Sequence, residues 1–225
     1  MAGTIVLIGG GEIVNRGSAE IDRYLLGLAG KRPTVAFISA ASNNTDYVRS
    51  FINYCKSIGG GEILPILLSK ESSQSIKKKI QQAQVVYFGS GDSKNLTSAI
   101  KQKGLLVELN NALKDGKVIA GISGGAVSVC KDSITRKAEK KPKASVSQGL
   151  GLTNICVDIN YLEANDKEIS NLSKKLGRVY AIPLGSGIAI RDDNVTMIGD
   201  SAKIAIFEKG TKITALTSLK RSFSF

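Results

Sequence analysis

The sequence contains no histidine and no tryptophan, and aromatic residues make up only 5% of its 225 residues. The lack of histidine removes the side chain that most often serves as a general base near neutral pH and as a zinc ligand. The three cysteines, Cys55, Cys130 and Cys156, are too few and too scattered for a disulfide framework or a recognisable zinc site. We therefore expect no metal, no cofactor, and three reduced and buried thiols.

Long apolar runs are also missing. No stretch approaches the roughly 20 apolar residues that a membrane-spanning helix needs. The N-terminus leads directly into the apolar segment GTIVLIGGG, without the basic region and cleavage site of a signal peptide. We expect a cytoplasmic protein without membrane contact.

Acidic residues are fewer than basic residues, with 19 Asp and Glu against 31 Lys and Arg and a net charge of +12. One dense basic cluster, RKAEKKPK, covers residues 136–143. No aromatic residues interleave with this cluster, so a base-stacking platform is unsupported and we expect no nucleic-acid partner. We expect the cluster to be an exposed loop and most other lysines to be solvated surface residues.

Apolar runs of strand length alternate with helical patterns through the first half of the chain. The expected strands cover residues 4–10, 34–42, 62–68, 85–89 and 117–123, and the expected helices cover 18–30, 46–58, 75–83, 94–104 and 105–116. This alternation predicts a mainly parallel sheet with helices on both faces, a three-layer α/β sandwich. Beyond residue 155 closely spaced strands, with one helix at 167–177, predict an antiparallel C-terminal extension. We expect one α/β domain over residues 1–225.

Glycine-rich turns follow several of the expected strands. The first, at residues 9–12, lacks the dinucleotide-binding spacing, because Val14 stands where that pattern requires glycine. No phosphate-binding P-loop sequence is present either. These turns are instead typical of chain exits at the C-terminal edge of an α/β sheet, where sites form.

Ser123 lies in the turn GISGG, between an expected strand and an expected helix. A strand-to-helix turn of the G-x-S-x-G type exposes a serine nucleophile and requires small neighbours. Backbone N–H groups at Gly124 and around Gly91 are candidates to stabilise an oxyanion. The alternative interpretation is a tight strand–helix junction whose small residues serve only close packing.

Five segments occur together in order: IGGGE, FISAAS, YFGSGDSKNL, IAGISGGAV, and GLGL before VDINY. With them the chain resembles the dipeptidase E and cyanophycinase family of serine peptidases, from Ile5 to about Gly199. The resemblance implies a fold related to class I glutamine amidotransferases. It also implies that Ser123 is the nucleophile and that Gly124 and Gly91 supply the oxyanion donors.

The family's catalytic histidine corresponds to Asn160 in this sequence. An amide side chain does not titrate near neutral pH, so Asn160 cannot act as a general base. Asp158, Glu163 or a lysine are candidates for a replacement base. A glutamine amidotransferase is disfavoured, because the cysteine and histidine of that chemistry are absent from the site.

The resemblance therefore implies a peptidase homologue with weak or altered activity. The alternative is a non-catalytic binding or regulatory protein on the same fold. The expected ligand is a small peptide, whose acidic side chain would contact Arg136, Lys137 and Lys140. We expect a monomer or a homodimer.

Overall fold

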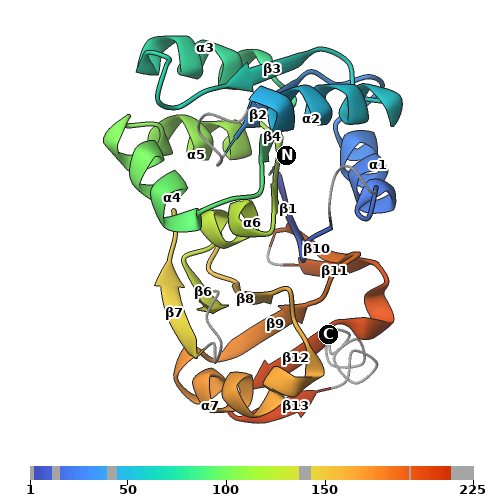
Figure 1. The fold of residues 1–225 in the computed structure, drawn as a ribbon, viewed down its shortest axis with the longest axis vertical. Coiled ribbons are helices and arrows are strands. Elements are labelled where there is room, and N and C mark those ends of the chain that lie inside the picture. The colour runs from blue at the N-terminus through green and yellow to red at the C-terminus, as the bar shows by residue number, and fades with distance from the viewer. Residues whose placement is uncertain (1–2, 12–15, 40–44, 137–142, 193, 214–225) are drawn as a thin grey trace.

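The computed structural model describes residues 3–11, 16–39, 45–136, 143–192 and 194–213. Within these ranges the chain forms a seven-stranded sheet and a six-stranded sheet, with helices packed against both (Figure 1). No helix in the described ranges is long and apolar enough to cross a membrane.

The first sheet has the strand order β11-β10-β1-β5-β4-β2-β3. Its strands are β1 (Thr4–Ile8), β2 (Val35–Ile38), β3 (Ile63–Ile66), β4 (Val85–Phe88), β5 (Val118–Ile122), β10 (Ser186–Arg191) and β11 (Asn194–Gly199). Strands β1 to β5 pair in parallel, and β10 and β11 add an antiparallel hairpin beside β1. The predicted parallel sheet with an antiparallel extension is therefore confirmed.

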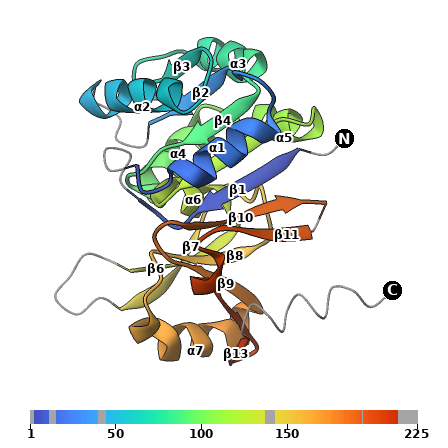
Figure 2. The ribbon, with the colours of Figure 1, turned by 90° about the vertical axis from the view of Figure 1, so that its right-hand side faces the viewer.

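Helices cover both faces of this sheet (Figure 2). One face carries α1 (Ala19–Leu28) and α2 (Thr45–Ser57), and the other carries α3 (Ser73–Gln82), α4 (Ser93–Gln102), α5 (Leu106–Lys114) and α6 (Gly124–Val129). Alternate strand residues divide between the two cores: Phe37 packs with α1 and α2, whereas Ile38 packs on the opposite face. The three-layer α/β prediction is confirmed.

The second sheet has the order β13-β12-β9-β8-β6-β7. Its strands are β6 (Asp132–Arg136), β7 (Ala144–Gln148), β8 (Cys156–Ile159), β9 (Arg178–Ile182), β12 (Ala205–Glu208) and β13 (Thr211–Ile213). One face joins the core of the first sheet through residues such as Ile182. The other face packs against α7 (Asp166–Leu176), where Ile169 and Phe207 are fully buried.

This second sheet differs from the sequence prediction in two ways. Strands β6, β7 and β9 were not expected, and β6, β8 and β9 pair in parallel rather than as antiparallel hairpins. Strands β6 and β7 have the sequences DSITR and ASVSQ, which lack the apolar run that marks a buried strand. Parallel pairing depends on connections through other elements, so closely spaced strands alone do not reveal it.

Candidate functional site

Ser123 occupies the turn between β5 and α6, at the C-terminal edge of the first sheet. Its backbone has φ +52° and ψ −118°, a conformation that non-glycine residues rarely adopt. The Ser123 amide donates to the carbonyl oxygen of Ile8 at 3.1 Å, which ties the turn to the end of β1. The residue is half-buried, and it lies between the strand and the helix that the elbow prediction names.

Close backbone contacts hold this turn in place and explain its glycines. A Cβ atom on Gly124 would overlap the carbonyl oxygen of Gly91, and one on Gly125 would overlap that of Phe88. A Cβ atom on Gly121 would lie 2.7 Å from the backbone of the α6 start. The predicted need for small neighbours around Ser123 is confirmed, and Gly91 and Gly124 are brought into direct contact.

Asn160 follows β8 of the second sheet, yet it reaches the same edge as Ser123. Its backbone amide donates to the carbonyl oxygen of Gly9 at 3.1 Å, one residue beyond the carbonyl that holds Ser123. Its side-chain oxygen packs against Gly10, where a Cβ atom would overlap it. The structure thus attaches both residues to the end of β1, and the catalytic roles assigned to them stay predictions.

The loop that contains Gly91 has a contact that the sequence did not reveal. The Ser90 amide donates to the Tyr47 hydroxyl at 2.9 Å, and the Tyr47 ring lies against Gly89. Burial raises the pKa of Tyr47, so its hydroxyl stays neutral near pH 7. In the sequence Tyr47 belongs to the apolar stripe of a helix, and nothing in that pattern distinguishes it from a core residue.

Arg136 does not lie in an exposed loop, and that expectation is wrong. It is the last residue of β6, and its side chain is only 14% exposed. Its Nη1 donates to both carboxylate oxygens of Asp158 at 2.7 and 3.0 Å, and its Nε donates to Glu168 at 3.2 Å. The guanidinium therefore links β6, β8 and α7. Lys137 and Lys140 lie outside the described residues.

Neither carboxylate considered as a replacement base forms a hydrogen bond with Ser123 among the described residues. Asp158 is fully buried beneath α7, where burial raises its pKa and the Arg136 guanidinium opposes that rise. Glu163 is exposed in the short 3-10 helix η1 (Glu163–Asn165). No described side chain accepts a hydrogen bond from the Ser123 hydroxyl.

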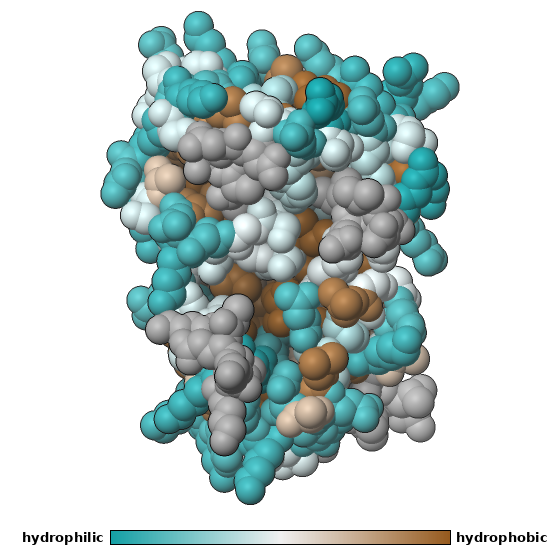
Figure 3. Space-filling view, in the orientation of Figure 1, coloured by the Kyte–Doolittle hydropathy of each residue, from teal (hydrophilic) through white to brown (hydrophobic). Residues whose placement is uncertain are grey.

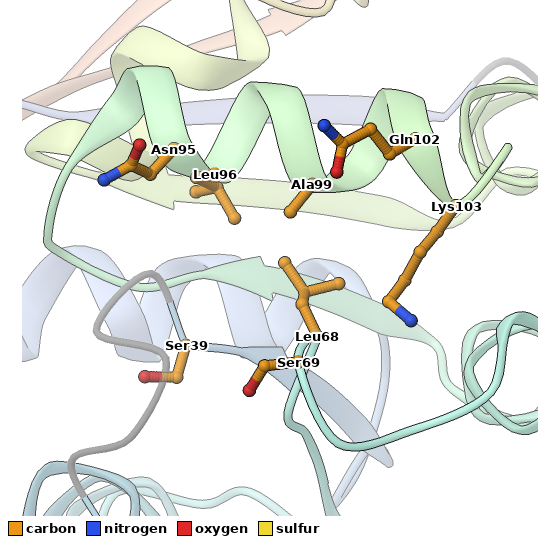
Figure 4. Close-up of a pocket in the computed structure, with 8 residues that line it drawn as sticks. All are labelled: Ser39, Leu68, Ser69, Asn95, Leu96, Ala99, Gln102 and Lys103. Atoms are coloured by element: carbon orange, nitrogen blue, oxygen red, sulfur yellow. The ribbon is translucent and has the colours of Figure 1, made fainter.

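A surface pocket of about 480 Å³ opens along α4, near the ends of β2 and β3 (Figure 4). Ser39, Ser69, Asn95 and Gln102 contribute polar groups, and Leu68 is among its apolar lining residues. The Lys103 ammonium at one end donates to the Glu71 carbonyl oxygen at 2.7 Å. The lining contains no carboxylate and no histidine, so this pocket does not supply a base for Ser123.

Apolar atoms also gather between the upper and lower halves of the face in Figure 3. Leu162 and Leu184, which follow β8 and β9, are 66% and 62% exposed. Leu184 lies against Gly10, beside Asn160. An apolar surface therefore borders the Asn160 side of the candidate site.

Metal-ligand clusters are not found in the described part of the chain. No group of three or more His, Cys, Asp or Glu side chains there has the geometry to hold a metal ion. Cys55, Cys130 and Cys156 are buried and unpaired, as predicted.

Comparison with known proteins places the fold and the glycine turns in one family. The sequence model of the family described as Peptidase family S51 matches residues 5–206, a range that includes every element of the candidate site. The chain belongs to peptidase family S51. The suspected resemblance to dipeptidase E is therefore confirmed at the level of the family.

Individual relatives of the S51 chain are distant. The Uncharacterized peptidase YgaJ of Bacillus subtilis (strain 168) is 29% identical over 138 residues, covering 60% of this chain and 59% of that protein. The chain thus matches less than two thirds of this relative's length.

Two solved structures share the S51 fold. The crystal structure of a peptidase from an acI-B1 Actinobacterium has a TM-score of 0.72 and 19% identity, covering 95% of this chain and 97% of that one. A putative peptidase E protein from Listeria monocytogenes EGD-e has a TM-score of 0.66 and 21% identity, covering 88% and 99%. At these identities the likeness concerns the fold alone.

Proposed function

We propose that this S51 chain is a serine-type peptidase homologue that receives small peptides at Ser123 and hydrolyses them slowly. The backbone conformation of Ser123, with φ +52°, is the observation that carries this proposal. Such strain persists where the surrounding structure enforces it, and it is common at functional sites. Here the turn is held by the close approach of Gly124 to Gly91 and by the hydrogen bond from the Ser123 amide to Ile8.

The reaction that this geometry supports is attack of the Ser123 hydroxyl on a peptide carbonyl. The oxyanion that forms would accept hydrogen bonds from the backbone amides of Gly124 and Gly91, the donors that the family resemblance implies. The proton of the hydroxyl must leave during the attack, and an imidazole normally accepts it. Asn160 has no titratable group for this step, so hydrolysis loses its general-base contribution.

The remaining acceleration comes from binding and oxyanion stabilisation. In serine peptidases these effects alone leave about 10³- to 10⁴-fold acceleration over water when the triad is removed. From the sequence we also propose that the substrate is a small peptide, that the protein acts in the cytoplasm, and that it is a monomer or a homodimer.

A fluorophosphonate probe tests whether Ser123 is nucleophilic. We expect a slow covalent adduct that mass spectrometry assigns to Ser123, and no adduct in Ser123→Ala. In Asn160→His the labelling and the hydrolysis of Asp-X dipeptides should rise, because general-base help contributes about 10²- to 10⁴-fold. The backbone at position 160 has φ +61°, a region in which histidine, like asparagine, is found more often than most residues.

The second candidate function is a binding or regulatory protein on the same fold, and it is favoured because no side chain in the described part of the chain accepts a hydrogen bond from the Ser123 hydroxyl. It predicts calorimetric binding of dipeptides with no adduct and no turnover. If Asn160→His folds normally and also fails to label, the peptidase proposal is contradicted and this second function replaces it.

A further inference from the structure

Strand β7 forms an edge of the second sheet, and its outer side has no partner strand in the described chain. It pairs only with β6, in a register that places Ser147 opposite Ser133 and Val146 opposite Ile134. The Gly149 amide donates to the Lys131 carbonyl oxygen at 3.0 Å. This bond shows which residues of β7 form hydrogen bonds with β6 and which face away from it. Because hydrogen-bonded pairs alternate along an antiparallel ladder, Ser147 bonds to β6 and the Val146 and Gln148 backbones point outward.

The remaining outward position on β7 supports this assignment. The Ala144 amide does not bond to β6 but donates to the Glu168 side chain at 3.5 Å. No described group accepts from the amides of Val146 or Gln148. These two residues are exposed, so the edge presents unpaired donors and acceptors at the spacing of a strand.

Helix α4 lies beside this edge and forms the other wall of a groove of about 600 Å³. Figure 1 shows β7 below α4, with the C-terminal end of the strand toward the helix. The wall from α4 contributes Lys94 and Lys101, which are exposed, with Thr97 and Ser98 between them. The two lysines are seven residues apart, so they lie on one helix face about 10 Å from each other.

No described carboxylate pairs with Lys94 or Lys101, and the chain as a whole has a net charge of +12. The groove therefore combines a strand edge with uncompensated positive charge. The same edge strand of a second copy, ASVSQ, contains no carboxylate that could pair with Lys94 and Lys101, so a second copy lacks charge complementarity to this groove. A phosphate backbone would accept from the strand amides but would leave the outward carbonyl groups unsatisfied.

We propose that the groove between β7 and α4 binds an extended, acidic peptide segment as an added strand. The segment's backbone bonds to the outward groups of Val146 and Gln148, and its carboxylates pair with Lys94 and Lys101. Strand addition of this kind takes affinity from backbone hydrogen bonds and specificity from the alternate side chains. The lining of this groove does not include Ser123, and binding there does not require hydrolysis.

Fluorescence anisotropy with a labelled peptide in which Glu alternates with Val tests the proposal. We expect saturable binding that weakens between about 50 and 300 mM salt, because exposed charge pairs are screened over about 10 Å or less. The same peptide with Lys in place of Glu should not bind. A single-stranded oligonucleotide should not displace the acidic peptide, and displacement would overturn the proposal in favour of a nucleic-acid site.

Two sets of variants separate the backbone contribution from the charge contribution. Val146→Pro removes one outward amide and leaves the bonds to β6 intact, so binding should weaken about three- to tenfold. The double variant Lys94→Gln with Lys101→Gln should weaken binding about five- to tenfold. The control with the same change of net charge, Lys56→Gln with Lys78→Gln on α2 and α3, should bind like the parent.

Hydrogen exchange on the unmodified chain keeps the proposal testable if Val146→Pro does not fold. The amides of Val146 and Gln148 should exchange more slowly when the acidic peptide is present, while exposed amides on α3 do not change. Equal weakening in both lysine double variants, or unchanged exchange at these two amides, would overturn the proposal. So would a dimer in light scattering that Val146→Pro dissociates, because the edge would then pair two copies.

Discussion

Replacing Arg136 by methionine removes the partner of a fully buried carboxylate. Asp158 has no exposed surface and accepts from Arg136 Nη1 at 2.7 and 3.0 Å. Without the guanidinium it must either stay charged in the core or bind a proton. Breaking a buried ion pair by removing one partner costs about 3–5 kcal/mol.

Protonation of Asp158 sets an upper limit to that cost. From the unperturbed carboxyl pKa of 3.8, binding a proton costs about 4 kcal/mol at pH 7 and about 1.5 kcal/mol at pH 5. We therefore expect Arg136→Met to lower the free energy of unfolding by about 3–4 kcal/mol at pH 7 and by markedly less at pH 5.

The sign of the pH effect follows from proton binding. In the folded variant the pKa of Asp158 is raised further, so the folded state holds a proton that the unfolded chain releases above pH 4. Stability relative to the parent then falls as the pH rises from 5 to 8. Urea unfolding followed by circular dichroism measures this difference at each pH.

The double variant Arg136→Met with Asp158→Asn is the matched control. The amide cannot ionise, so the pH dependence should disappear and part of the stability should return. A loss below 1 kcal/mol at pH 7 in Arg136→Met, or a loss that does not change with pH, would refute the buried-pair reasoning. Weaker peptide binding with unchanged stability would instead support the contact between Arg136 and substrate that the sequence suggested.

Two further predictions concern the turn at Ser123 and the buried thiols. Gly124→Ala should lower the free energy of unfolding by about 2–3 kcal/mol and abolish probe labelling, because its Cβ would overlap the Gly91 carbonyl oxygen. The control is Gly27→Ala on α1, which has open space around it and should stabilise the protein slightly in the same urea unfolding experiment. Burial raises the pKa of Cys55 to about 12, so its thiolate fraction at pH 8 is about 10⁻⁴. The thiol reagent DTNB should therefore react with Cys55 at least about 100-fold faster after unfolding. Rapid reaction in the folded chain would contradict this burial.

The sequence by itself determined the first sheet and the turn at Ser123, because both depend on local patterns. Apolar runs of strand length alternate with helical stripes, and each is completed within a few residues. The GISGG turn is also a local pattern, a serine among glycines directly after an apolar run, and the structure confirms the strand before Ser123 and the helix after it.

Only the tertiary structure decided which distant residues meet. Ser123 and Asn160 reach the same sheet edge because the consecutive carbonyls of Ile8 and Gly9 accept from their amides. The sequence predicts that Arg136 belongs to a basic loop. In the structure β6 and β8 pair in parallel, and this pairing brings Arg136 to Asp158. Such pairings join residues far apart in the chain, and the periodicity of one segment contains no information about the segment it will contact.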